Sequence, residues 1–123
     1  MRDLKHLIYF ENLLQEANNE LVKQAKAEGK FAIGYTCYFM PEVLLDLPGC
    51  FSVRLRAPRC SSPDIATYYM SARVCHYGRS LFERALEGGF NFLDAQMATE
   101  TCTVTCRFQA VSYTHLTLPT KLE

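Results

Sequence analysis

The sequence lacks the features that mark several common classes of protein. It has no run of about 18 apolar residues, so we expect no transmembrane helix. Its first residues include no unbroken apolar segment with a small-residue cleavage site, so we expect no signal peptide and a cytoplasmic location. Thirteen basic and thirteen acidic residues cancel. This balance gives no reason to expect nucleic acid or a membrane as partner.

The chain also lacks a compact metal motif, although it has six cysteines among 123 residues. No two of them form a C-x-x-C pair, the usual signature of a small zinc site. Because no secretion signal is expected, metal binding or redox chemistry is a better interpretation than disulfides. The alternative is that several of them are small buried hydrophobic residues.

Helical and extended patterns alternate along the chain. Apolar residues recur at helical spacing over residues 3–28, which predicts one amphipathic N-terminal helix. Further predicted elements are strands at 31–37, 50–55 and 90–97, a short helix at 41–46, and helical structure at 64–88 with a break near Cys75. This order predicts an α/β fold with a parallel sheet flanked by helices, of the Rossmann or flavodoxin type.

The composition changes abruptly near the C-terminus. Residues 110–120 have no Lys, Arg, Asp or Glu, and from Val111 they match a translation of a transposon-end adapter used in sequencing libraries. We therefore interpret residues 110–123 as an adapter-derived segment and leave them out of the fold prediction. Residues 1–30 then form the N-terminal helical segment, and residues 31–109 form an incomplete α/β domain. We expect the natural gene to continue past Gln109.

Three cysteines are expected at the same end of the predicted sheet. Cys37 ends the first strand, Cys102 follows the third, and Cys75 lies near the start of a helix. In open α/β sheets ligands bind at the carboxyl ends of the strands. A helix N-terminus stabilises a thiolate, the form of cysteine that binds metal. The three thiols could therefore converge, although their spacing alone does not require it.

Three motifs resemble the front part of the 2-hydroxyacyl-CoA dehydratase family, whose benzoyl-CoA reductase branch has the same cluster fold. They are GYTCYFMPEVLLDLPGCFSVRLRAP at 34–58, CHYGRSLFERALEGGFNFLD at 75–94, and TETC at 99–102. The step from Cys75 to Cys102 is also similar to that of the family. The chain departs from the family pattern at Ala95, where Gly is frequent, and at Thr103, where Asp or Asn is frequent.

The resemblance implies an iron–sulfur site. In this family three cysteines of a subunit hold a [4Fe-4S] cluster, and Cys75 and Cys102 match two of them. The third ligand is expected further along a longer chain, while Cys37 is expected close to the site. Cys37 and Cys106 are additional candidate ligands, and for each cysteine the alternative is a buried or incidental thiol.

The resemblance also implies a reaction and its partners. A 2-hydroxyacyl-CoA would lose water through a ketyl radical, after an ATP-dependent iron–sulfur activator protein has injected one electron. The expected partners are the acyl-CoA substrate, a homologous second subunit and that activator. Glu42 is a candidate catalytic base; the alternative is an acid that only stabilises the start of a helix.

Other interpretations stay open. The parent protein could be a benzoyl-CoA reductase-type subunit, or a non-catalytic structural domain that binds zinc or no metal. With only two expected ligands, we predict that the 123-residue chain alone is inactive.

Overall fold

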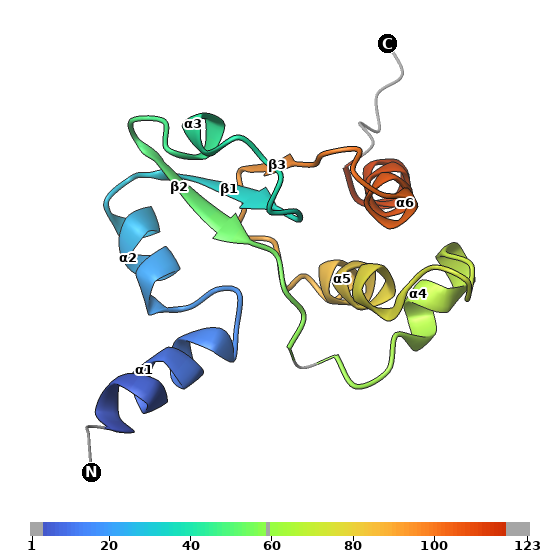
Figure 1. Cartoon of the computed structure of the whole chain (residues 1–123), viewed down its shortest axis with the longest axis horizontal. Helices are drawn as coiled ribbons and strands as arrows, with labels where there is room; N and C mark the ends of the chain where they lie inside the picture. The colour runs from blue at the N-terminus through green and yellow to red at the C-terminus, as the bar shows by residue number, and fades with distance from the viewer. Residues whose placement is uncertain (1–3, 59, 118–123) are drawn as a thin grey trace.

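The computed structural model describes residues 4–58 and 60–117 of the chain. Its elements in chain order are α1 (Leu4–Leu14), α2 (Glu20–Ala27), β1 (Phe31–Tyr35), α3 (Glu42–Leu45), β2 (Cys50–Arg54), α4 (Asp64–Tyr69), α5 (His76–Leu86), β3 (Ala95–Met97), α6 (Thr103–Ser112) and a π-helical turn, η1 (Tyr113–Thr117) (Figure 1). Within this part of the chain, no helix is both long enough and apolar enough to cross a membrane.

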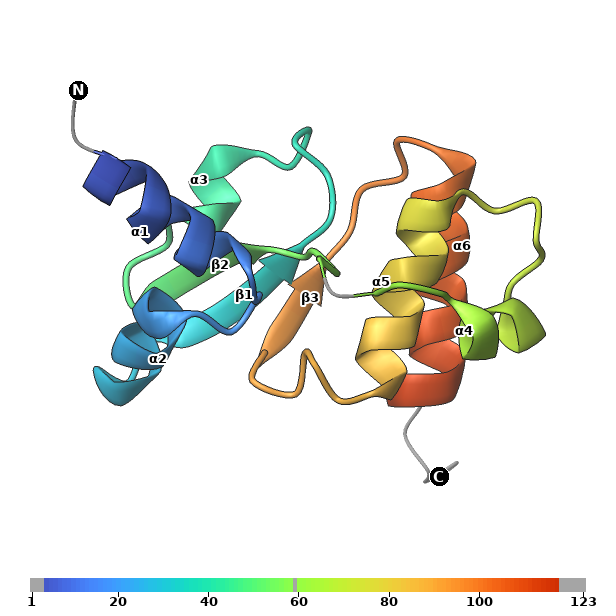
Figure 2. The same ribbon diagram turned by 90° about the horizontal axis from the view of Figure 1, so that it is seen from below.

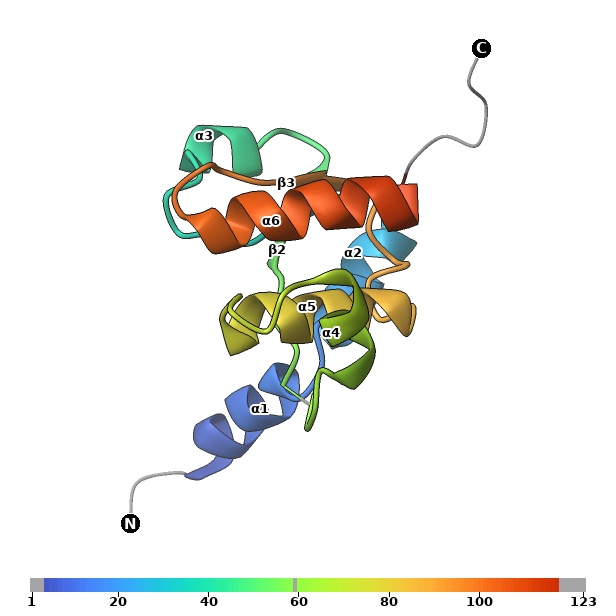
Figure 3. The same cartoon turned by 90° about the vertical axis from the view of Figure 1, so that its right-hand side faces the viewer.

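The three strands form one parallel sheet in the order β2-β1-β3. Phe31 of β1 is opposite Cys50 of β2, and Ile33 is opposite Ala95 of β3. Helices α2 and α5 lie on one side of the sheet and α3 lies on the other (Figures 1 and 3). This arrangement confirms the predicted α/β class with a parallel sheet flanked by helices.

Buried apolar side chains form two clusters. The larger one joins the end of β2 to α4, α5 and α6 through Leu55, Ala66, Met70, Leu81, Phe82 and Phe108. The smaller one holds α3 against β1 through Ile33, Met40 and Leu45. Helices α5 and α6 pack side by side beyond β3 (Figure 2). The larger cluster therefore supports both helices that follow the expected cysteine ligands.

The prediction of one helix over residues 3–28 is wrong, because the chain forms α1 and α2 with a break between them. Asn19 accounts for the break. Its side-chain oxygen accepts the N–H of Val22 at 3.2 Å, and its side-chain nitrogen donates to the carbonyl of Leu13 at 3.3 Å. Asparagine is a strong N-cap because it satisfies a free N–H at the start of a helix.

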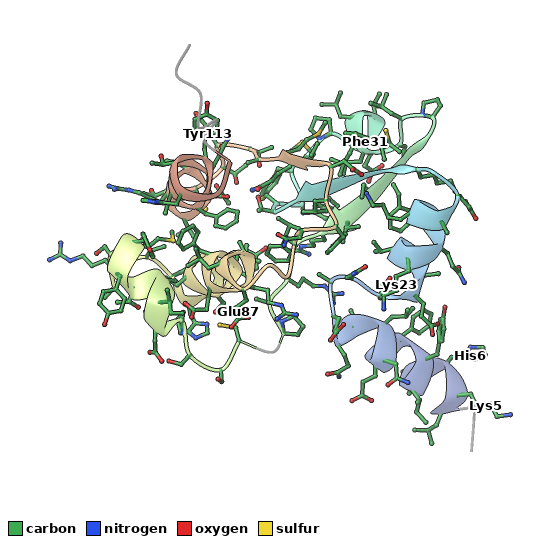
Figure 4. The ribbon with its side chains drawn as sticks, turned by 180° about the vertical axis from the view of Figure 1, so that it is seen from behind. Lys5, His6, Lys23, Phe31, Glu87 and Tyr113 are labelled. Carbon is green, nitrogen blue, oxygen red and sulfur yellow. The ribbon has the colours of Figure 1, made fainter. Side chains whose placement is uncertain are left out.

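Helix α1 contributes no buried residue to the fold. Its apolar side chains Leu4, Leu7, Ile8 and Phe10 are exposed. Figure 4 shows Lys5 and His6 at its N-terminal end, pointing away from the sheet. The amphipathic pattern of α1 therefore forms a helix whose apolar face has no cover within the described residues.

The third strand is shorter than the predicted 90–97, since β3 begins only at Ala95. Gly88, at φ +80°, ends α5 in a conformation that glycine adopts readily. Two turns follow, in which Asn91 N–H donates to the Gly88 carbonyl and Leu93 N–H to the Phe90 carbonyl. The apolar residues of this stretch pack against the larger cluster from these turns and not from a strand.

Candidate metal centre

The carboxyl ends of β1 and β3 lie side by side and carry two of the expected cysteines. Cys37 follows the end of β1, and Cys102 lies after β3, immediately before α6. The chain passes from β1 outward to β2 and then returns to β3 on the other side, so its direction across the sheet reverses between β1 and β3. Such a switch point is where open α/β folds bind ligands.

The Cys37 sulfur is surrounded by hydrogen-bond donors. The hydroxyl of Thr101 lies 3.3 Å from Sγ and donates to it. The backbone N–H of Phe39 is the main cause that lowers the pKa of the Cys37 thiol, and the Thr101 hydroxyl is the next. Donors aimed at sulfur stabilise its charged form. The hydrogen-bond donors around Cys37 therefore favour its thiolate form over an ordinary thiol.

Cys102 is the N-cap of α6 and forms a capping box with Thr105. The Thr105 hydroxyl lies 3.5 Å from the Cys102 sulfur and accepts the Cys102 N–H at 3.4 Å. The side chain and then the backbone N–H of Thr105 are the main causes that lower the pKa of the Cys102 thiol. The start of α6, a helix that the sequence did not predict, thus favours the thiolate form of the exposed Cys102.

Cys75 is the N-cap of α5 and its thiol is exposed. This confirms the predicted helix break and the position of Cys75 near a helix start. The backbone around it is held in place by Arg79, whose Nε donates to the Val74 carbonyl at 3.1 Å and whose N–H donates to the Cys75 carbonyl at 3.3 Å. Cys75 therefore presents an accessible sulfur on a fixed backbone.

Tyr77 joins the start of α5 to the ends of two strands. Its hydroxyl lies 3.2 Å from the carbonyl oxygen of Thr36 and 3.1 Å from that of Leu55, and it donates to this pair. Thr36 and Leu55 are the first residues after β1 and β2. The hydroxyl therefore lies at the same end of the sheet as Cys37.

The pKa of Tyr77 also reports which charged groups surround its hydroxyl. Burial raises this pKa most, and the nearby Arg54 guanidinium opposes the rise. The thiols of Cys37 and Cys75 both contribute to raising it, because a negative charge nearby disfavours the phenolate. The charges of both thiols therefore act on the Tyr77 hydroxyl.

The donor set has the chemistry of an iron–sulfur ligand set. Cys37, Cys75 and Cys102 supply accessible or partly accessible sulfur, the ligand atom of such clusters. Residues 4–58 and 60–117 contain no group of three or more Cys, His, Asp or Glu side chains placed to hold one metal ion. The three thiols therefore do not form a site for a single metal ion within the described residues.

A buried polar atom beside Cys37 also lacks a partner. The Thr36 hydroxyl oxygen is buried and makes no hydrogen bond within the described residues. Buried polar groups without partners are uncommon and are often found where a site is completed by a further group. The residues at this end of the sheet thus fit a thiolate-bound cluster, provided that further protein supplies another ligand.

The remaining candidates lie elsewhere in the fold. Cys106 is on α6, one turn after Cys102, and lines a hollow with Gln96 and Glu100. Glu42 is exposed in the first turn of α3, where an acid stabilises a helix. The structure leaves their proposed chemical roles untested.

Three residues that organise the site received no role from the sequence, although the first two lie within the quoted motifs: Tyr77, Thr101 and Thr105. Thr105 gave no clear signal, because Cys102-x-x-Thr105 does not match the usual Ser/Thr-x-x-Glu/Gln pattern of a capping box. Tyr77 and Thr101 contact residues far away in the sequence, the nearest of them 22 positions distant. No local pattern reveals such contacts.

An α/β fold with thiols grouped at a sheet switch point defines a candidate cysteine-ligated metal protein. The family model described as 2-hydroxyglutaryl-CoA dehydratase, D-component, matches residues 37–120, which is more than half of the chain. The chain therefore belongs to this family and is a 2-hydroxyacyl-CoA dehydratase-type subunit, as the motifs predicted. Comparisons with curated proteins and with solved structures give no match.

The family match includes part of the segment that we interpret as adapter-derived. It runs through residue 120, and α6 itself extends to Ser112. The origin of residues 110–123 stays a prediction, which the gene sequence downstream of Gln109 tests. Continuation of the α/β pattern with a further cysteine would support the prediction, whereas a natural gene that encodes these residues would contradict it.

Proposed function

We propose that this chain supplies Cys75 and Cys102 as two of the three cysteine ligands of a [4Fe-4S] cluster in a 2-hydroxyacyl-CoA dehydratase. The observation that carries the proposal is the shared position of these residues. Each is an exposed N-cap at the start of a helix, α5 or α6, and these two helices pack against each other. The third ligand would come from protein beyond Gln109.

A cluster held by three thiolates supplies an open iron that acts as a Lewis acid, together with one-electron chemistry. In the proposed reaction, one electron from an ATP-dependent activator converts the thioester of a 2-hydroxyacyl-CoA into a ketyl radical anion. Loss of hydroxide, loss of a proton from the β-carbon and return of the electron then give the enoyl-CoA. The electron is therefore recycled, and the net change is removal of water.

The residues of this chain would prepare the ligands for that role. The Thr105 hydroxyl and the N-terminus of α6 lower the pKa of Cys102, and the hydrogen-bond donors around Cys37 lower the pKa of that second thiol. Glu42 is our candidate for the base that removes the β-proton. Its position at the start of α3, two residues after the buried Met40, fixes its backbone but leaves the carboxylate accessible.

The proposal also requires partners. A homologous second subunit would complete the enzyme, and an acyl-CoA would be its substrate. The family description names a component of a dehydratase, which supports an assembly of more than one subunit.

The test is metal analysis of the parent protein after anaerobic reconstitution. We expect about four iron and four acid-labile sulfide per subunit, with broad thiolate-to-iron charge-transfer absorption. The purified protein should also dehydrate a 2-hydroxyacyl-CoA only when its activator and ATP are present. Stoichiometric zinc without sulfide would contradict the proposal and favour a structural zinc domain. Reduction of an aromatic acyl-CoA in place of dehydration would assign the protein to the benzoyl-CoA reductase branch.

A further inference from the structure

The side chain of Tyr77 connects the segments that carry Cys37 and Cys75. Tyr77 is not itself a proposed cluster ligand. Tyr77 lies two residues after Cys75, in the first turn of α5. Its hydroxyl reaches back to the sheet, 3.2 Å from the carbonyl of Thr36, the residue immediately before Cys37. The chain between these two contacts spans 41 positions, so the hydrogen bond closes a long loop at the site.

We propose that Tyr77 is a positioning residue, whose hydroxyl bond to the Thr36 and Leu55 carbonyls sets the distance between the Cys37 and Cys75 sulfurs. Its role in holding the proposed ligand Cys75 in place for a cluster, next to the Cys37 thiol, rests on the proposed function. The placement itself does not, because the hydrogen bonds exist within the chain alone.

Tyr77 is well suited to this task. A phenol ring has few rotatable bonds, so fixing its hydroxyl also fixes the backbone of the helix start. The second carbonyl, of Leu55, belongs to a residue that is almost fully buried and pairs with β1 through its N–H to the Tyr35 carbonyl at 2.8 Å. The hydroxyl is therefore anchored to a rigid part of the sheet.

The separation between Cys37 and Cys102 is fixed in another way. The Thr101 hydroxyl, one residue before Cys102, donates to the Cys37 sulfur. Loss of the Tyr77 hydroxyl should therefore loosen Cys75 relative to Cys37 and leave Cys102 in place. A change in the position of Cys75 without a change in that of Cys102 would indicate a positioning role for Tyr77. A general role in stability would affect both cysteines.

The experiment crosslinks thiols in the full 123-residue chain with dibromobimane, which joins two nearby cysteines and becomes strongly fluorescent only when both ends have reacted. Peptide mapping then gives the yield of each pair. In Tyr77→Phe we expect the Cys37–Cys75 product to fall by about threefold to tenfold, the population change expected for loss of one hydrogen bond. The Cys37–Cys102 product should not change.

Tyr68→Phe is the matched control, because Tyr68 is 89% exposed and loses the same hydroxyl group. It should leave both yields unchanged. An unchanged Cys37–Cys75 yield in folded Tyr77→Phe would overturn the proposal, as would an equal fall of both products.

If circular dichroism shows that Tyr77→Phe does not fold, crosslinking of the unaltered chain provides the test. The ratio of Cys37–Cys75 to Cys37–Cys50 product should be much higher in native buffer than in denaturant, because Cys50 lies at the opposite end of the sheet. Equal ratios would overturn the proposal. A parent protein without any cluster, combined with the selective fall in crosslinking, would refute the proposed function and leave the placement by Tyr77 intact.

Discussion

The two ends of the β-sheet differ in what their polar side chains do. At the amino end the Asp94 carboxylate accepts the N–H of Ala32 at 2.8 Å and the Lys26 ammonium at 2.7 Å, which ties β3, β1 and α2 together. At the carboxyl end the Thr101 hydroxyl donates to the Cys37 sulfur, and the Thr105 hydroxyl, which also contacts the carbonyls of Thr99 and Cys102, lies 3.5 Å from the Cys102 sulfur. One end uses its polar groups to hold strands, and the other uses them to prepare thiols.

This difference indicates that stability and ligand binding depend on separate residues. The amino-end contacts satisfy each other within the fold. The carboxyl end leaves exposed thiols and an unpaired buried hydroxyl at Thr36, among the described residues. Substitutions at one end should therefore change unfolding with little effect on the thiols, and substitutions at the other end should do the reverse.

The largest effect should come from the larger apolar cluster, which packs α4, α5 and α6 against the end of β2. Phe82 is fully buried and packs edge-to-face on Tyr69, with ring centroids 5.6 Å apart. We expect Phe82→Ala to lower the free energy of unfolding by about 3–5 kcal/mol, because a large cavity replaces the ring. Urea unfolding measures this. Tyr68→Phe is the surface control, and a loss of less than about 1 kcal/mol in Phe82→Ala would contradict the assigned core.

The second-largest effect concerns the contacts of Asp94 at the amino end of the sheet. The hydrogen bond from Lys26 and then that from the Ala32 N–H hold the pKa of the Asp94 carboxyl below its usual range. A carboxyl whose pKa is lower in the folded state stabilises the fold above its unfolded pKa, and this contribution disappears as pH falls through the folded value. We therefore expect Asp94→Asn to lower the melting temperature at pH 7 and to remove part of the acid sensitivity below about pH 4.

Asp46→Asn is the control for this change, because Asp46 is an exposed residue at the end of α3. Thiol alkylation rates in Asp94→Asn should match those of the unaltered chain under native conditions. A shift in the Cys37 or Cys102 rate would break the proposed separation of the two ends.

The smallest expected effect concerns the reactivity of the thiols at the carboxyl end of the sheet. Because the pKa values of the Cys37 and Cys102 thiols are lowered, both should react with iodoacetamide at a lower pH than an ordinary thiol, whose pKa is about 8.5. Thr105→Val should raise the pKa of Cys102 and leave that of Cys37 unchanged. Mass spectrometry of the labelled peptides over a pH series measures both. Equal shifts at the two cysteines would show that Thr105 acts on the whole fold.

Much of this arrangement could be predicted from the sequence. The strand order along the chain and the helix break before Cys75 follow from local patterns, and together they indicate a parallel sheet with cysteines at one end. The division of the N-terminal helix was missed because the apolar spacing continues across Asn19, whereas the capping hydrogen bond depends on that single side chain.

Long-range contacts could not be predicted. The Lys26–Asp94 pair joins residues 68 positions apart, and the Tyr77 hydroxyl contacts two carbonyls that any residue type could have supplied. Such contacts depend on how the elements pack. The cysteines could be recognised in the sequence as candidate ligands because few residue types have their chemistry. The tyrosine and threonines that organise them belong to common residue types.

The central claim is that Cys75 and Cys102 bind the same cluster, and the iron content of cysteine variants of the parent protein tests it most directly. We expect Cys75→Ser and Cys102→Ser each to lose most of the iron and sulfide after anaerobic reconstitution. Cys60→Ser should retain both, because Cys60 lies in the loop before α4 and not at the start of α5 or α6. A full cluster in either Cys75→Ser or Cys102→Ser would contradict the claim.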